Sequence, residues 1–245
     1  MRRHFPCVLA LLAATLLPLS AAAMTFAEQS FVCPIDGQTF STRVMSSGTS
    51  FGSYFDTQRF GPIASPAPLP MCPGNGFIVI DENRSYSEAE LVKLRAFVAS
   101  DDYRGWVAND TPYYRLAKQM AWSGESPDRV AGVLLQATWE AGSKRYPRYA
   151  AEALEAMQQR AAREAGTDQA YHTRMLIGEL QRRLGRFDQA QATFDALRGD
   201  RAFPGKQDED TAVYMRKVLD AQLQLIRSRS VAHARLDEDG TIVDF

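Results

Sequence analysis

The sequence predicts a mainly α-helical protein, in which about six to seven helices form a bundle of helical hairpins beside a small N-terminal head of β-strands and loops. Three observations lead to this fold class. Capped amphipathic segments follow one another from Ser87 onward. Residues 175–197 have the pattern of two helices joined by a tight turn. Residues 24–86 differ in composition, with glycine, serine, phenylalanine and proline prominent.

The chain has 245 residues, of which 45% are hydrophobic, so it can bury a core of its own. We expect a signal peptide at residues 1–23, the head at 24–86, the helical domain at 87–232 and a C-terminal tail with a short strand at 233–245. The formal net charge is −1 and there is no long basic run, which argues against a nucleic-acid partner.

The first residues have the three parts of a secretory signal peptide. Arg2 and Arg3 form a short positive region, Val8–Leu19 an apolar region, and Ala21–Ala23 a cleavage site of small residues. The apolar run is too short for a membrane-spanning helix. No later stretch is long and apolar enough to span a membrane. We therefore expect a secreted protein, with the periplasm as its compartment.

The head is predicted to consist of short strands and extended loops. Residues 39–44 and 77–80 have β-strand propensity, and five prolines fall between Pro62 and Pro73. Because proline fixes φ and lacks an amide donor, residues 62–70 are expected to cross the head as an extended loop. At the other end of the chain, Asp239-Gly240 predicts a turn before a short terminal strand.

The two cysteines of the mature chain lie in matching sequences, Cys-Pro-Ile-Asp-Gly from Cys33 and Cys-Pro-Gly-Asn-Gly from Cys72. Each resembles a zinc-ribbon knuckle whose second cysteine is replaced, by Asp36 in one and by Asn75 in the other. A structural zinc needs four good ligands, whereas an oxidising compartment favours a disulfide. We expect a Cys33–Cys72 disulfide and no cofactor. The alternatives are a zinc site using Cys33, Asp36 and Cys72, or thiols that are free or redox-active.

Residues 48–52 match the Gly-x-Ser-x-Gly pattern of a hydrolase nucleophile elbow, with Ser50 at its centre. That chemistry requires a strand, a strained turn and a helix, followed by an acid and a histidine from an alternating α/β sheet. Pro62 leaves little room for the helix, and the chain that follows is helical. A glycine-rich turn is therefore the preferred interpretation, with a hydrolase using Ser50 as the alternative.

Start and stop signals divide the rest of the chain into helices. Ser87 and Glu90 form a capping box, and Thr111-Pro112 and Ser126-Pro127 each begin a further helix. The expected helices cover about residues 87–99, 112–123, 127–141, 147–163, 169–184, 188–198 and 208–229. Helical spacing makes the core the default position for most of their aromatic residues, namely Trp106, Trp122, Trp139, Tyr113 and Tyr114.

Residues 175–197 match the core of a tetratricopeptide (TPR) repeat. Ile177-Gly178 stands at the Leu-Gly pair of the repeat, and Ala190 and Phe194 stand at its A-x3-F step. Small residues at Gly178 and Ala190 would let the two helices approach closely. The pattern therefore predicts a TPR-like helical bundle, although Arg174 stands where the repeat usually has tryptophan.

Two further blocks extend the comparison beyond the repeat. Cys33-Pro34 and Cys72-Pro73 begin the two knuckles, and Leu176–Gly185 reads Leu-Ile-Gly-Glu-Leu-Gln-Arg-Arg-Leu-Gly. On these residues the chain resembles a bacterial family of unknown function, whose members join a CxxC…CPxCG ribbon-like head to a TPR-like body. The resemblance covers most of the mature chain. It implies this architecture and no particular reaction, and the replaced knuckle cysteines depart from it.

The expected function follows from the groove that the first helix of a TPR repeat lines. With Gly178 at its usual place, five residues fall on or near that groove: His172, Met175, Glu179, Arg182 and Arg183. Cations, an acid and a thioether suit an extended peptide or a C-terminal carboxylate. We therefore expect a non-enzymatic protein that binds another envelope protein or a peptide. The same residues could instead form the solvated face of a small bundle. The alternative function is a metal- or thiol-dependent function of the head that uses Cys33, Asp36 and Cys72.

Overall fold

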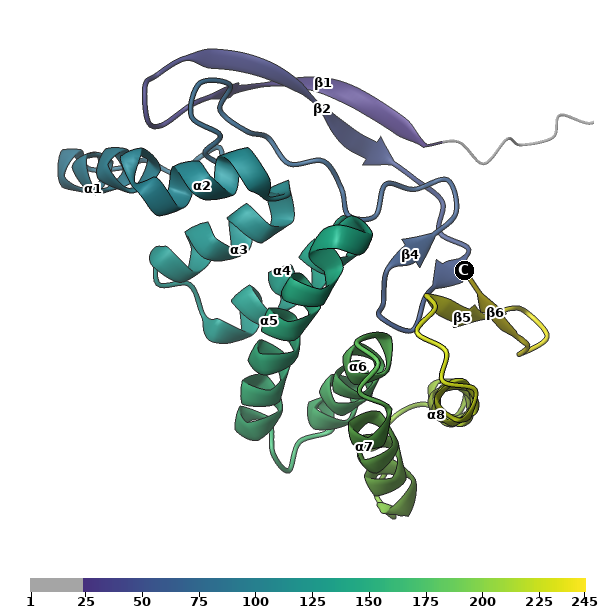
Figure 1. Cartoon of the computed structure of the whole chain (residues 1–245). Coiled ribbons are helices and arrows are strands. Elements are labelled where there is room, and N and C mark those ends of the chain that lie inside the picture. The colour runs from purple at the N-terminus through teal and green to yellow at the C-terminus, as the bar shows by residue number, and fades with distance from the viewer. Residues whose placement is uncertain (1–23) are drawn as a thin grey trace, which may run out of the picture.

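The structure of the protein is a computed structural model that describes residues 24–245, so the predicted signal peptide lies outside the described residues. The described chain is mainly α-helical, as predicted, with small β-hairpins near both of its ends (Figure 1). No helix in residues 24–245 is long and apolar enough to cross a membrane. The helices are α1 (Glu88–Ala99), α2 (Asp101–Asn109), α3 (Pro112–Trp122), α4 (Pro127–Trp139), α5 (Gly142–Arg163), α6 (Gln169–Arg183), α7 (Phe187–Gly199) and α8 (Glu209–Arg227).

Side-chain caps and prolines begin several helices where the sequence predicts them. Ser87 and Glu90 form the predicted capping box at α1. Pro112 and Pro127 occupy the first turns of α3 and α4, where the missing amide donor costs nothing. Asp208 caps α8 by accepting a hydrogen bond from the amide of Thr211 at 2.9 Å.

Two helices differ from the sequence-based prediction. The predicted set does not include α2, which begins because the Ser100 hydroxyl accepts a hydrogen bond from the Tyr103 amide at 3.2 Å. The predicted start of α5 was Pro147, whereas the helix begins at Gly142 and contains that proline. Pro147 is exposed, so the carbonyl that loses its amide partner can bind water instead.

Consecutive helices from α3 to α7 pack against one another, and α8 packs against α7 (Figure 1). The close approach predicted for α6 and α7 is present: a Cβ atom at Gly178 would lie 2.5 Å from ring atoms of Phe194. Gly185 ends the turn after α6 with a φ of 73°. The largest core joins α3, α4, α5 and α6 and also takes in Ile78 of the head.

The strands form three separate two-stranded hairpins in the described chain. The paired strands are β1 (Thr25–Val32) with β2 (Thr39–Ser47), β3 (Gly52–Ser53) with β4 (Arg59–Phe60), and β5 (Ala234–Leu236) with β6 (Ile242–Asp244). The predicted strand at residues 77–80 is reduced to a single bridge between Met71 and Ile78. The tail hairpin turns at Gly240, whose φ is 81°.

The predicted disulfide joins Cys33 and Cys72, whose Cα atoms are 5.4 Å apart. Each cysteine carbonyl accepts a hydrogen bond within its own knuckle, from Gly37 at 2.8 Å and from Gly76 at 2.9 Å. Both cysteines are buried in a small core that also includes Leu94 of α1. The head is therefore packed onto the first helix of the body.

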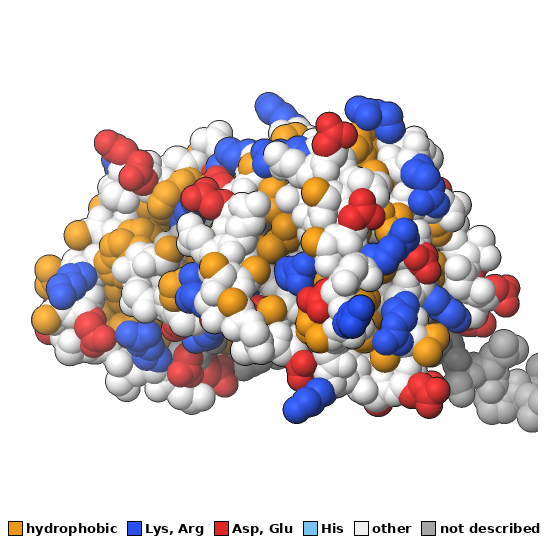
Figure 2. All heavy atoms as spheres, turned by 90° about the horizontal axis from the view of Figure 1, so that it is seen from below, with side chains coloured by type: hydrophobic (Ala, Val, Ile, Leu, Met, Phe, Trp, Pro, Cys, Tyr) orange, Lys and Arg blue, Asp and Glu red, His pale blue; other side chains and the backbone are white. Residues whose placement is uncertain are grey.

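Acidic and basic side chains are interspersed over the face of the molecule seen in Figure 2. This distribution agrees with the formal net charge of −1.

Candidate functional site

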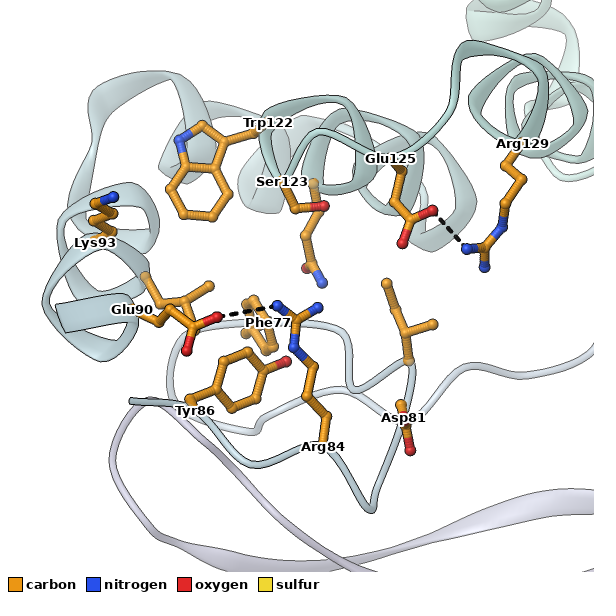
Figure 3. A pocket seen from close by; sticks show the side chains of 13 residues that line it. Phe77, Asp81, Arg84, Tyr86, Glu90, Lys93, Trp122, Ser123, Glu125 and Arg129 are labelled. Atoms are coloured by element: carbon orange, nitrogen blue, oxygen red, sulfur yellow. Dashed lines mark hydrogen bonds and ion pairs between the residues drawn. The ribbon is translucent and has the colours of Figure 1, made fainter. Parts of the chain in front are cut away.

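A cleft opens between the head and the helical body, where residues 77–86 face α1 and the C-terminal end of α3 (Figure 3). We name it the α1–α3 cleft. Its volume is about 440 Å³. The bottom is apolar and the rim is charged, so the cleft combines the two kinds of contact that ligand sites use.

Aromatic side chains form the bottom and walls of the α1–α3 cleft. Phe77 and Leu94 are buried beneath it, whereas Trp122 at the end of α3 is 43% exposed. The Trp122 ring stacks on Phe97, with ring centroids 4.2 Å apart and an interplanar angle of 17°. In Figure 3, Trp122 and Tyr86 enter from opposite sides, with Phe77 between them. The indole is thus held in place while one face stays open to a ligand.

Charges of both signs surround the apolar bottom. The rim carries three acidic and three basic side chains: Asp81, Glu90, Glu125, Arg84, Lys93 and Arg129. Arg84 lies 3.4 Å from the Glu90 carboxylate, and its guanidinium carbon lies 4.7 Å from the centre of the Tyr86 ring. Pairs this exposed contribute little to stability. Their charges are therefore free to exchange partners with a ligand.

Two groups at the rim have shifted pKa values. Burial raises the pKa of the Tyr86 phenol, and the positive charge of Arg84 partly opposes that rise. Hydrogen bonds from the backbone amide and hydroxyl of Ser87 lower the pKa of Glu90. Near neutral pH, Tyr86 is a neutral donor and Glu90 an anion. Tyr86 can therefore donate a hydrogen bond to a ligand, and Glu90 can pair with a positive charge on it.

Hydrogen bonds from the helices hold the head segment that forms one wall of the cleft. The buried Gln119 amide accepts from the Ile78 amide at 3.1 Å and donates to the Ile78 carbonyl at 2.8 Å. The Tyr103 hydroxyl donates to the Gly76 carbonyl at 2.9 Å, and Arg115 donates to the same oxygen at 3.3 Å. Burial raises the pKa of Tyr103 to about 12, so its hydroxyl stays a donor. The wall is therefore fixed before any ligand binds.

Glu179 and Arg182, two of the residues predicted to line a groove on α6, lie in the interior instead. Both are fully buried. Arg182 donates to both carboxylate oxygens of Glu179 at 2.8 Å and to the backbone carbonyls of Ser230 and Ala232. The expectation that these two residues line an open groove is therefore corrected. The physical reason is that the segment that follows α8 covers this part of α6.

The other three predicted residues lie nearer the surface. His172 and Met175 line a small open pocket of about 120 Å³ between α6, α8 and the head. Arg183 donates to the buried Asp56 carboxylate at 2.7 Å, and the second oxygen of Asp56 is 3.0 Å from His233 Nε2. Arg183 is therefore paired, and Asp56 links the head, α6 and the tail.

The structure brings the four knuckle positions together. Asn75 Nδ2 lies 3.3 Å from Asp36 Oδ2 and 3.6 Å from Cys33 Sγ. Cys33 and Cys72 share the disulfide, so this set presents bonded sulfurs rather than thiolates. Within residues 24–245, no group of three or more His, Cys, Asp or Glu side chains is arranged to hold a metal ion.

Ser50 makes its hydrogen bonds within its own turn. Its hydroxyl donates to the Gly52 carbonyl at 2.9 Å and accepts from the Gly52 amide at 3.3 Å. The glycine-rich turn leads directly into β3, and it is followed by the β3–β4 hairpin. This arrangement differs from the strand, turn and helix that a nucleophile elbow requires.

From the sequence, the core was the default position for most of the aromatic residues, Trp122 among them. The structure shows that these residues differ in burial. Tyr113 and Tyr114 are buried, whereas Trp122 is half-exposed. One local signal distinguishes it: Trp122 is the last residue of α3, directly before the turn at Ser123 and Gly124. A side chain at a helix end is covered by fewer neighbours.

Comparisons with protein-family models, with curated proteins and with solved structures found no match. The α1–α3 cleft combines aromatic, aliphatic, acidic and basic side chains in one lining.

Proposed function

We propose that this protein is a non-enzymatic module that binds an extended segment of another envelope protein, or a free peptide, at the α1–α3 cleft. The observation that carries the proposal is the half-exposed Trp122 indole, fixed by Phe97 above an apolar bottom and surrounded by charges of both signs. Tryptophan, tyrosine and arginine, all present here, are the side chains enriched at the energetic centres of protein interfaces.

The size of the cleft indicates how much of a partner it takes. About 440 Å³ is near the lower end of the range for ligand pockets. That volume suits one or two apolar side chains, with the rest of the segment lying over the rim. Rim charges such as Arg84 and Glu90 would then select the residues on either side of the anchor.

The α6 face was the surface expected from the sequence, and the burial of Glu179 and Arg182 favours the cleft in its place. The interpretation of the body as TPR-like stays a prediction. Export to the periplasm is part of the proposal. It is supported by the signal-peptide pattern of residues 1–23 and by the Cys33–Cys72 disulfide, a bond that persists in oxidising compartments.

The proposal is tested by selecting peptides from a random phage-displayed library against residues 24–245 and measuring their affinities by fluorescence anisotropy. We expect Trp122→Ala to bind the selected peptides about thirtyfold more weakly, because a central aromatic side chain contributes 2 kcal/mol or more. Val92→Ala removes an exposed apolar side chain of α1 that does not line the cleft, and this variant should bind them as the wild type does.

A second variant separates binding from folding. Arg84→Ala changes an exposed rim residue and should also weaken binding, while the urea midpoint of each variant reports whether it is folded. Equal affinity for the wild type, Trp122→Ala and Arg84→Ala would contradict the proposal. Loss of binding in Val92→Ala alone would contradict it as well.

A further inference from the structure

A second groove lies between the β3–β4 hairpin, α8 and the turn of the tail hairpin. We name it the tail groove. Its volume is about 840 Å³. In Figure 1, β4, β5, β6 and the C-terminal end of the chain lie together beside α8. The tail groove and the α1–α3 cleft have no lining residue in common.

Exposed aromatic rings form the apolar part of the tail groove. Phe51 is 62% exposed and Tyr214 is 45% exposed. The groove already holds one cation against its rings: the guanidinium carbon of Arg235 lies 4.2 Å from the centre of the Phe60 ring and 5.9 Å from that of Phe245. This packing demonstrates that the rings here accept a guanidinium, while Phe51 and Tyr214 keep open faces.

Three consecutive acidic residues, Asp237, Glu238 and Asp239, border the same groove. Asp237 holds the turn, because its Oδ1 accepts from the backbone amides of Asp239 at 3.1 Å and Thr241 at 2.7 Å. Glu238 and Asp239 are exposed. Asp239 also borders an adjoining groove that contains Arg198, Lys217 and Arg227. The lining of the tail groove therefore includes three acidic side chains and one basic side chain, that of Arg235.

We propose that the tail groove binds a basic segment of a partner protein. Its lysine or arginine side chains would stack on Phe51 and Tyr214 and pair with the carboxylates of the tail turn. Charge complementarity selects this occupant, because exposed ring faces and an excess of carboxylates both attract cations. The same carboxylates would repel an acidic segment. The inference is independent of the peptide proposed for the α1–α3 cleft.

The probe is a short fluorescein-labelled peptide that alternates lysine and leucine, and the matched probe has glutamate in place of lysine. Binding to residues 24–245 is measured by fluorescence anisotropy at low and high salt. We expect the lysine peptide to bind and the glutamate peptide not to bind. The affinity for the lysine peptide should fall as salt rises, because the paired charges are exposed to solvent.

Variants locate the bound peptide. Tyr214→Ala should weaken binding of the lysine peptide about tenfold, and Phe51→Ala tests the other exposed ring. The pair Glu238→Gln with Asp239→Asn should weaken binding about fivefold at low salt. Val92→Ala should leave the affinity unchanged, because Val92 is exposed on α1 and lines neither groove.

A matched control removes the same charge elsewhere. The pair Glu28→Gln with Glu155→Gln changes two exposed carboxylates outside the groove and should leave the affinity unchanged. Equal weakening by both pairs would mean attraction to the overall charge and would overturn the proposal. Tight binding of the glutamate peptide would overturn it, and so would a loss of binding in Trp122→Ala without a loss in Tyr214→Ala and Phe51→Ala.

Discussion

Arg182 determines how the end of the chain is attached to α6. Its guanidinium hydrogen-bonds to Glu179, to Gln222 and to the backbone carbonyls of Ser230 and Ala232. Burial raises the pKa of Glu179, and the positive charge of Arg182 opposes that rise. A buried pair is costly to desolvate, yet leaving one member alone is costlier.

Glu179→Ala should lower the free energy of unfolding by about 3–5 kcal/mol, because Arg182 would remain as an uncompensated buried charge. Urea denaturation of residues 24–245 measures the loss. Glu155→Ala, at an exposed position of α5, is the matched control and should change the value by less than about 0.5 kcal/mol. A loss at Glu179 below about 1 kcal/mol would contradict the role given to the pair.

The capping carboxylate of Glu90 predicts a pH dependence. Hydrogen bonds from Ser87 hold its folded pKa below the unfolded value of about 4.3. Its stabilisation is therefore complete above the unfolded pKa and is lost as pH falls through the folded pKa. The difference in thermal midpoint between the wild type and Glu90→Gln should shrink between about pH 6 and about pH 3. A constant difference across that range would exclude ionisation as its cause.

Local sequence patterns predicted the disulfide pairing correctly and the burial of two charged residues incorrectly. The matching knuckles around Cys33 and Cys72 led to the disulfide that is present. Glu179 and Arg182 were placed on an open groove because the TPR pattern, with Gly178 at its usual position, puts them on the first helix of the repeat. The segment that covers them, residues 230–232, lies far away in the sequence. No pattern within α6 could reveal that cover.

Among the contacts between secondary-structure elements, the packing of α6 against α7 depends on a single glycine. Gly178 lets the two helices meet because even a methyl group there would lie 2.5 Å from the Phe194 ring. Start signals were enough to predict α1, α3 and α4. The signal for α2 was missed because Ser100 caps a new helix immediately after another ends. The predicted helix stopped at residue 99, and Ser100 directly after it was not recognised as the cap of a further helix.

Gly178→Ala should lower the free energy of unfolding by about 1–3 kcal/mol through overpacking, although alanine is the better helix former. Gly132→Ala in α4 is the matched control, because a Cβ atom there would meet nothing within 4 Å. That variant should raise stability by up to about 1 kcal/mol. Urea denaturation distinguishes the two. A gain in both variants would contradict the close packing of α6 and α7.

Three long-range connections make the whole molecule one unit. Ile78 of the head enters the main helical core, Asp56 pairs with Arg183 of α6 and with His233 of the tail, and the disulfide closes the head. The fold class was predictable because caps and periodicity are local. The α1–α3 cleft was not, since residues 77–86 and Trp122 meet only in the folded chain.

The disulfide should stabilise the whole molecule. Replacing Cys33 and Cys72 with serine should lower the free energy of unfolding by roughly 4 kcal/mol on the chain-entropy model, given their sequence separation of 39. Reductant should shift the urea midpoint of the wild type and leave that of the double variant unchanged. Intact mass with and without reductant reports the bond directly. A wild-type urea midpoint that is unchanged after complete reduction would contradict this prediction.

The most direct test of the proposed function is a map of where a selected peptide binds. The three tryptophan indole N–H groups of the chain give separate signals in a ¹H–¹⁵N NMR spectrum of residues 24–245. Titration with a selected peptide should shift the Trp122 indole signal and the Gln119 side-chain amide signals, because both residues line the cleft. Shifts confined to residues around His172 and Met175, with Trp122 unchanged, would contradict it.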